Sequence, residues 1–126
     1  WQHVLEPVIA YLTLGMHLHQ NPSKFGNAYN FGPFAEDSLP VQEMLNLSIN
    51  YWGSGKFKVE QAKNQPHEAG LLKLDISKAI KELGWKPKLN ASSAVEMTMN
   101  WYKDFYTKPK QIKNITIQQI LTFLSK

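Results

Sequence analysis

The chain has 126 residues, of which 43% are hydrophobic, so it is long enough for one hydrophobic core and too short for two comfortable domains. Its formal net charge is +4, and all 14 basic residues are lysines. Because planar contacts to bases and phosphates favour arginine, this composition argues against a nucleic-acid-binding module. The absence of cysteine excludes disulfides, thiolate metal sites and cysteine nucleophiles.

The first residue is Trp1, and the sequence has neither a basic-then-apolar leader nor an apolar run long enough to cross a bilayer. We therefore expect no signal peptide and no membrane association. The chain is expected to be a piece of a longer soluble protein, which is cytoplasmic by default.

The first half of the sequence predicts two helices with a strand between them. Glu6-Pro7 is typical of a helix entry, because proline suits the first helical turn, and Asn21-Pro22 is expected to stop that helix. Residues 28–31 form a short apolar and aromatic run between glycines, which predicts a buried strand. A second helix is expected to open at residues 38–41 and to end at Gly53.

The second half predicts two more strands and three more helices. The strands are expected at residues 57–60 and 71–74. Asp75 is placed to cap a helix over residues 76–83, and Gly84 suits the left-handed residue that follows it. A further helix follows Asn90.

The chain is expected to break at residues 108–111 and then to form an amphipathic helix. Thr116 and Gln119 have the spacing of a capping box, which predicts that this last helix begins at Thr116. Together the elements predict a helix-rich α+β unit with no room for a doubly wound sheet. We expect residues 1–108 to form one lobe and residues 109–126 a helical tail that docks on it.

The sequence lacks the motifs of a complete redox enzyme. No glycine-rich dinucleotide motif is present, since Gly53 and Gly55 are not followed by a third glycine at the required spacing. Tyr106 and Lys110 have the Tyr-x-x-x-Lys spacing of a short-chain dehydrogenase, but Pro109 between them breaks the helix that the pair requires. We expect no catalytic, cofactor-binding or metal-binding residue in this chain.

Six motifs resemble, in order, the C-terminal portion of the CDP-glucose 4,6-dehydratases, which are extended short-chain dehydrogenases/reductases. The narrower ones are Trp-Gln-His-Val-Leu-Glu-Pro at 1–7, Pro-His-Glu-Ala at 66–69 and Thr-Ile-Gln-Gln-Ile at 116–120. Two motifs are shared more widely across the extended family, namely Leu-Lys-Leu-Asp-x-Ser-Lys-Ala at 72–79 and Leu-Gly-Trp-x-Pro at 83–87. The sixth motif is Tyr-Asn-Phe-Gly-Pro at 29–33.

The resemblance implies a two-lobed parent enzyme of α/β Rossmann type. Its N-terminal lobe, absent here, would bind NAD and carry the catalytic groups, while this chain would be the substrate-binding lobe. Such lyases oxidise the sugar at carbon 4, eliminate water across carbons 5 and 6 and return the hydride to carbon 6. The resemblance further implies a bacterial protein of deoxysugar, O-antigen and lipopolysaccharide biosynthesis. The parent is expected to be a homodimer formed through the absent lobe, and this chain alone to be inactive.

The same resemblance implies a nucleotide-sugar site in the loop before residues 71–74. His67 and Glu68 would contact the ribose or the diphosphate, because a carboxylate accepts from vicinal hydroxyls and an imidazole donates to a phosphate oxygen. Many relatives carry arginine where this chain has Gln65, and a second arginine is expected just ahead of Trp1, so diphosphate affinity should be poor. Trp1, Gln2 and His3 are weaker candidates beside that position.

Two alternatives stay open. The chain is also compatible with a lobe of another extended-family nucleotide-sugar dehydratase or epimerase, which differs in base and sugar. The other alternative is a non-catalytic interaction domain built on the same scaffold.

Overall fold

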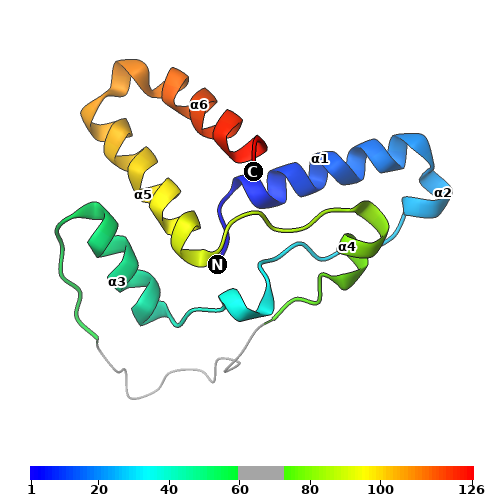
Figure 1. Cartoon of the computed structure of the whole chain (residues 1–126), viewed down its shortest axis with the longest axis horizontal. Coiled ribbons are helices and arrows are strands. Elements are labelled where there is room, and N and C mark those ends of the chain that lie inside the picture. Colours follow the sequence, from blue (N-terminus) through cyan, green and yellow to red (C-terminus); the bar gives the residue numbers. More distant parts are fainter. Residues whose placement is uncertain (60–72) are drawn as a thin grey trace.

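The computed structural model describes residues 1–59 and 73–126, and all regular elements within these ranges are helices (Figure 1). In chain order they are α1 (Leu5–Gln20), α2 (Pro22–Phe25), the 3-10 turn η1 (Ala35–Asp37), α3 (Val41–Trp52), α4 (Ser77–Leu83), α5 (Ala91–Thr107), the 3-10 turn η2 (Pro109–Gln111) and α6 (Ile112–Leu124). The prediction of a helix-rich fragment is confirmed. None of the helices in these ranges has the length and apolarity needed to cross a membrane.

The helix ends follow local capping chemistry. Gly53 and Gly84 end α3 and α4 in the left-handed conformation, with φ of 94° and 65°, as the sequence predicts. The Asn90 side chain accepts a hydrogen bond from the backbone N–H of Ser93 and caps α5. The prediction that Asp75 caps α4 is wrong, because this helix begins at Ser77, its N-cap residue is Ile76 and no side chain caps it. Asp75 lies one residue earlier and accepts from the N–H of Ser77 at 2.9 Å. Hydrogen bonds from Ser77 hold the pKa of this carboxyl below its ordinary value.

One predicted stop is instead the start of a short helix. Asn21 ends α1, but its side chain also accepts from the N–H of Lys24 and caps α2, whose first residue is Pro22. Proline at the first helical position lacks only an N–H that would have no intrahelical partner. The same two residues therefore end one helix and begin another.

The predicted strand at residues 28–31 is absent, and residues 57–59, the described part of the strand predicted at 57–60, have no strand structure either. These findings correct the α+β expectation for the described residues. A strand needs a backbone partner, and segment 28–31 is held by side chains instead. Asn30 donates to the carbonyl oxygen of Asp75, and Lys78 donates to that of Ala28. The third predicted strand, at 71–74, lies partly outside the described residues, and its last two residues have no strand structure.

The tail begins earlier than the predicted capping box. Thr116 lies inside α6, where its hydroxyl donates to the carbonyl oxygen of Ile112 and accepts from the indole N–H of Trp101 at 2.8 Å. The Gln119 amide donates to the carbonyl oxygen of Met97 at 2.8 Å. Both residues therefore join α6 to α5 instead of capping a helix start, and the prediction that α6 begins at Thr116 is wrong.

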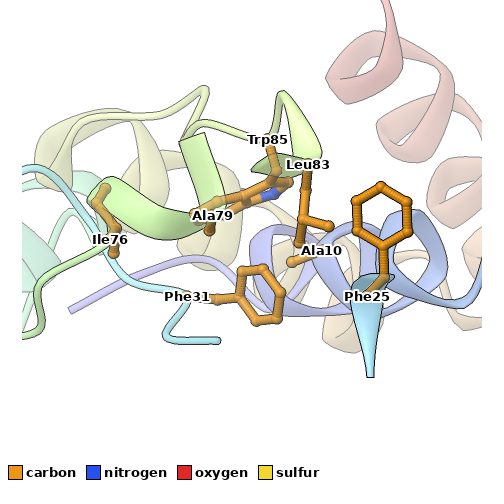
Figure 2. Close-up of a cluster of buried hydrophobic side chains, with 7 residues drawn as sticks. All are labelled: Ala10, Phe25, Phe31, Ile76, Ala79, Leu83 and Trp85. Carbon is orange, nitrogen blue, oxygen red and sulfur yellow. The ribbon is translucent and has the colours of Figure 1, made fainter. Parts of the chain in front are cut away.

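Two clusters of buried side chains form the core. The larger one joins α1, α2, the 28–34 segment, α4 and the turn after α4 (Figure 2), with Phe31 and Trp85 packed edge to face at 5.0 Å between ring centroids. The smaller one is centred on Phe123 of α6, which contacts the start of α5 and the side chains of Leu5 and Ile9 on α1. Helix α1 contributes to both clusters, while α3 packs against α5.

Candidate functional site

The first three residues lie where the 31–39 segment approaches the N-terminus. The indole N–H of Trp1 donates to the carbonyl oxygen of Leu39 at 3.1 Å, and the amide of Gln2 donates to that of Phe31 at 3.4 Å. Trp1 remains 58% exposed, so most of its ring is available for contact. Trp1 and Gln2, two of the three weaker candidates for substrate contact, are thus held by hydrogen bonds but are not buried.

His3 differs from its neighbours because it is buried. Its Nδ1 accepts a hydrogen bond from the backbone N–H of Leu5 at 3.2 Å, and its ring stacks on Phe123 at 6.4 Å between centroids. Because Nδ1 is an acceptor, a neutral ring must carry its proton on Nε2. Burial lowers the pKa of this imidazole below 6.5, since the charged form loses hydration. His3 is therefore neutral at physiological pH.

Two neighbouring cavities open on either side of Gln2 and Thr98, which line both. The larger is about 470 Å³ and lies among the N-terminal segment, α5 and α6. Its polar lining includes the side chains of Tyr102, Thr116 and Gln119. The smaller is about 170 Å³ and lies among Trp1, α3 and α5. A volume of several hundred Å³ is within the range of small-molecule sites.

The larger cavity is lined by neutral groups. Among residues 1–59 and 73–126, its lining contains amides, hydroxyls, aromatic rings and His3, but no lysine, aspartate or glutamate. Such a set suits an uncharged planar or hydroxylated group through hydrogen bonds and ring contacts. The described part of this lining offers no lysine to a diphosphate.

Sequence reasoning missed Glu6, a carboxylate that is only 1% exposed. Its Oε1 accepts from the backbone N–H groups of Lys88 and Leu89 at 2.8 and 2.9 Å, which ties α1 to the segment before α5. Its Oε2 has no hydrogen-bond partner among the described residues. The sequence signal that could have identified Glu6 is that it is the only acidic residue between Trp1 and Gln20 and has apolar residues on both sides, at positions 4–5 and 7–12.

The main predicted contacts to a ligand, His67 and Glu68, lie outside the described residues, as does Gln65. The structure therefore brings together Trp1, Gln2 and His3 but does not test the loop. The Tyr106 and Lys110 pair is divided between α5 and η2, so no single helix carries both. No group of three histidine, aspartate or glutamate side chains within residues 1–59 and 73–126 could hold a metal ion.

No protein-family model matches the chain. The CDP-glucose 4,6-dehydratase of Salmonella typhimurium is 37% identical over 103 residues, which cover 82% of this chain. The chain is a relative of the nucleotide-sugar 4,6-dehydratases. The dTDP-glucose 4,6-dehydratase of Streptomyces antibioticus is 26% identical over 72% of the chain, and GDP-mannose 4,6 dehydratase 1 of Arabidopsis thaliana is 41% identical over 52%.

The chain spans 29%, 27% and 19% of these three dehydratases, respectively. Most of each relative thus has no counterpart here. The activity that the names of these dehydratases describe belongs to proteins several times longer than the region they share with this chain.

Proposed function

We propose that this chain is the substrate-binding portion of an NAD-dependent CDP-glucose 4,6-dehydratase, a lyase that forms CDP-4-keto-6-deoxyglucose for deoxysugar biosynthesis. The observation that supports this most is the 37% identity to the Salmonella typhimurium enzyme over 82% of the chain. In this proposal residues 1–108 form the lobe that holds the nucleotide sugar, and residues 109–126 form its tail. The parent acts as a cytoplasmic enzyme.

The residues of this chain do not fit a dinucleotide site of their own. Gly53 and Gly55 follow the C-terminal end of α3, whereas a pyrophosphate binds where a glycine-rich turn meets the N-terminus of a helix. The carbonyl groups at a helix C-terminus would repel such an anion. We therefore assign NAD to the part of the enzyme outside this chain and derive no redox step here.

The neutral cavity beside Gln2 supports a division of the substrate between two regions. Its amides and hydroxyls match the base or the sugar, while the diphosphate requires donors elsewhere. His67, Glu68 and Gln65 are the proposed contacts for the ribose and the diphosphate. Gln2 and His3, which line this cavity, and Trp1, which lines the smaller one, are the other proposed contacts.

A titration of the chain with CDP-glucose, followed by NMR, tests this proposal. The indole N–H signals are the probes, because Trp1 and Trp101 lie beside the two cavities whereas Trp85 is buried in the other core cluster. We expect CDP-glucose to shift the signals of Trp1, Trp101 and the Gln2 amide and to leave Trp85 unchanged. A Gln2→Ala variant should weaken these shifts, and Gln42→Ala, an exposed position on α3, should not.

The nucleotide sugars named by the relatives serve as matched competitors. Equal shifts with CDP-glucose, dTDP-glucose and GDP-mannose would support nucleotide-sugar binding but contradict CDP-glucose specificity. An absence of shifts at millimolar concentrations of all three would contradict a substrate-binding role for this chain by itself.

A further inference from the structure

The C-terminal end of α5 carries exposed aromatic rings. Tyr106 and Phe105 are 68% and 42% exposed, and their rings lie edge to face at 5.3 Å between centroids. Trp52, the last residue of α3, is 36% exposed and packs edge to face against Tyr106 at 6.3 Å. The cluster therefore extends from α5 to α3. Because exposed apolar side chains are ordinary when they are scattered singly, a cluster of exposed rings indicates an interaction surface.

The sequence around these rings is basic. Residues 101–113 contain four lysines, namely Lys103, Lys108, Lys110 and Lys113. Asp104 is the only acidic residue at positions 97–126, and it pairs with Lys108 at 2.7 Å between Nζ and Oδ1. Four lysines and one aspartate leave a net charge of +3 on this segment. The positive charge of the chain is therefore concentrated beside the exposed rings.

The lysines and the rings lie at one corner of the molecule. A Cβ built on Gly53, which ends α3, would lie 3.9 Å from the Nζ atom of Lys103, so this ammonium group of α5 reaches the end of α3. Lys108 directly follows α5, Lys110 lies in η2, and Lys113 lies in the first turn of α6. Figure 1 shows the turn between α5 and α6 (orange) at an outer corner, on the side opposite α2.

Rings with lysines beside them suit the headgroup region of an anionic bilayer. Tryptophan and tyrosine favour the boundary between hydrocarbon and water, because their rings are apolar and their N–H and O–H groups are polar. Lysine ammonium groups are attracted to negatively charged headgroups. Phe105 gains from contact with the apolar layer just below the headgroups. The two kinds of side chain thus match the two layers of a membrane surface.

Other occupants fit this surface less well. A nucleic acid offers phosphates to the lysines, but planar contacts to phosphates and bases favour arginine, which the chain lacks. A single strand can also stack its bases on aromatic rings, so it is the competitor to exclude by experiment. A second copy of the chain would bring the lysines of both copies together, and their like charges would repel.

We propose that Trp52, Phe105 and Tyr106, together with Lys103, Lys108, Lys110 and Lys113, form a docking surface for an anionic lipid bilayer. On this α5 surface the rings would lie at the level of the headgroups and the lysines beside the anionic lipids. The sequence-based expectation of no membrane association rests on the lack of a spanning segment, which a surface contact does not require. None of these residues lines either cavity beside Gln2, so the inference is independent of nucleotide-sugar binding.

Sedimentation of the chain with lipid vesicles tests the proposal. We expect the chain to sediment with vesicles of phosphatidylglycerol and phosphatidylcholine in equal amounts, and to stay in solution with vesicles of phosphatidylcholine alone. Raising the salt concentration from about 0.1 M to about 1 M should release the chain, because the Debye length falls from about 10 Å to about 3 Å. No nucleotide sugar is added.

Lysine substitutions distinguish the α5 surface from a general effect of positive charge. Lys110→Gln combined with Lys113→Gln should raise the apparent dissociation constant for the anionic vesicles at least roughly tenfold, since each lysine near such a membrane strengthens binding about fivefold. Lys81→Gln combined with Lys86→Gln is the matched control, because it removes the same charge from exposed positions in α4 and just after it. The control pair should change the dissociation constant much less.

A fluorescent label tests which side of the molecule meets the membrane. The chain has no cysteine, so Tyr106→Cys and Tyr11→Cys each accept a single environment-sensitive fluorophore. The two tyrosines are 68% and 65% exposed, but Tyr11 lies on α1. At saturating anionic lipid, we expect the emission of the label at position 106 to move to shorter wavelength and that of the label at position 11 to stay unchanged.

A chain that does not sediment with the anionic vesicles at about 0.1 M salt would overturn the proposal. Equal effects of the two lysine pairs would do the same, because they would indicate attraction by net charge alone. An emission shift at position 11 as large as that at position 106 would place the contact on another surface. Displacement of the chain from the vesicles by an equimolar single-stranded oligonucleotide would assign the α5 surface to nucleic acid instead.

Discussion

At the scale of single residues, His3 makes the stability of the fold depend on pH. Burial lowers the pKa of its imidazole in the folded chain, so below pH 6.5 the unfolded chain binds more protons than the folded one. The stabilising contribution is therefore fully present above pH 6.5 and is lost as the pH falls through the folded-state pKa. We expect the free energy of unfolding, measured by urea denaturation, to decrease as the pH is lowered from neutrality.

His3→Asn tests the assignment, because an asparagine side chain can still accept from the N–H of Leu5 but does not titrate. In this variant, the free energy of unfolding should lose most of its pH dependence between neutrality and the onset of carboxylate protonation. His19→Asn is the control, since His19 is exposed near the C-terminal end of α1. If the free energy of unfolding of His3→Asn changes with pH as steeply as that of the wild-type chain, a group other than His3 causes the pH dependence.

Glu6 is a residue whose structural role could not be predicted from the sequence pattern. The pattern predicts a helix entry at Glu6-Pro7 because proline suits the first helical turn. It does not reveal that the carboxylate reaches across the fold to the N–H groups of Lys88 and Leu89, more than 80 positions later. That contact depends on where the chain returns, which local spacing does not encode.

At the scale of elements, the longer helices could be predicted from the sequence, whereas α2, the start of α6 and the absence of strands could not. Helix ends depend on neighbours a few residues away, so Gly53, Gly84 and Asn90 could be assigned from the sequence. A strand depends on a partner that is distant in the chain or lies outside it. Residues 28–31 have strand composition but no paired backbone among the described residues, so composition alone was insufficient.

The α5 and α6 pair gives a prediction at this scale. Thr116→Val keeps the shape of the side chain but removes the acceptor for the indole N–H of Trp101, a half-buried donor. We expect a loss of about 1–3 kcal/mol in the free energy of unfolding, because a buried donor without a partner costs its desolvation. Thr107→Val is the control, since the hydroxyl of Thr107 bonds only to the carbonyl oxygen of Lys103, on the exposed end of α5.

The two valine variants are compared by urea denaturation and by the exchange rate of the Trp101 indole proton. If Thr116→Val is no less stable than Thr107→Val, the Thr116 hydroxyl does not stabilise the contact between α5 and α6. Equal indole exchange in the wild-type chain and the Thr116→Val variant would have the same meaning.

At the scale of the whole molecule, the position of the candidate site could be predicted only in part. The sequence motif at 1–7 identified Trp1, Gln2 and His3, and the structure places them beside two cavities. The larger cavity lies where α5 and α6 approach the N-terminal segment, and the smaller one lies among Trp1, α3 and α5, so no local sequence pattern marks either position. Thr116 and Gln119, which the sequence suggested as a cap, line the larger cavity instead.

The closure of this end of the molecule depends on Phe123, which is 1% exposed and packs with Leu89, Ala94 and the α1 side chains of Leu5 and Ile9. Phe123→Ala should lower the free energy of unfolding by about 3–5 kcal/mol, because it removes the centre of a core cluster. It should also increase the exchange of the α6 amides. Leu124→Ala is the matched control, since that side chain is 48% exposed, and should change stability by about 0.5 kcal/mol or less. Equal effects of the two substitutions would mean that α6 does not dock on the body, and the cavity beside Gln2 would then lose one of its walls.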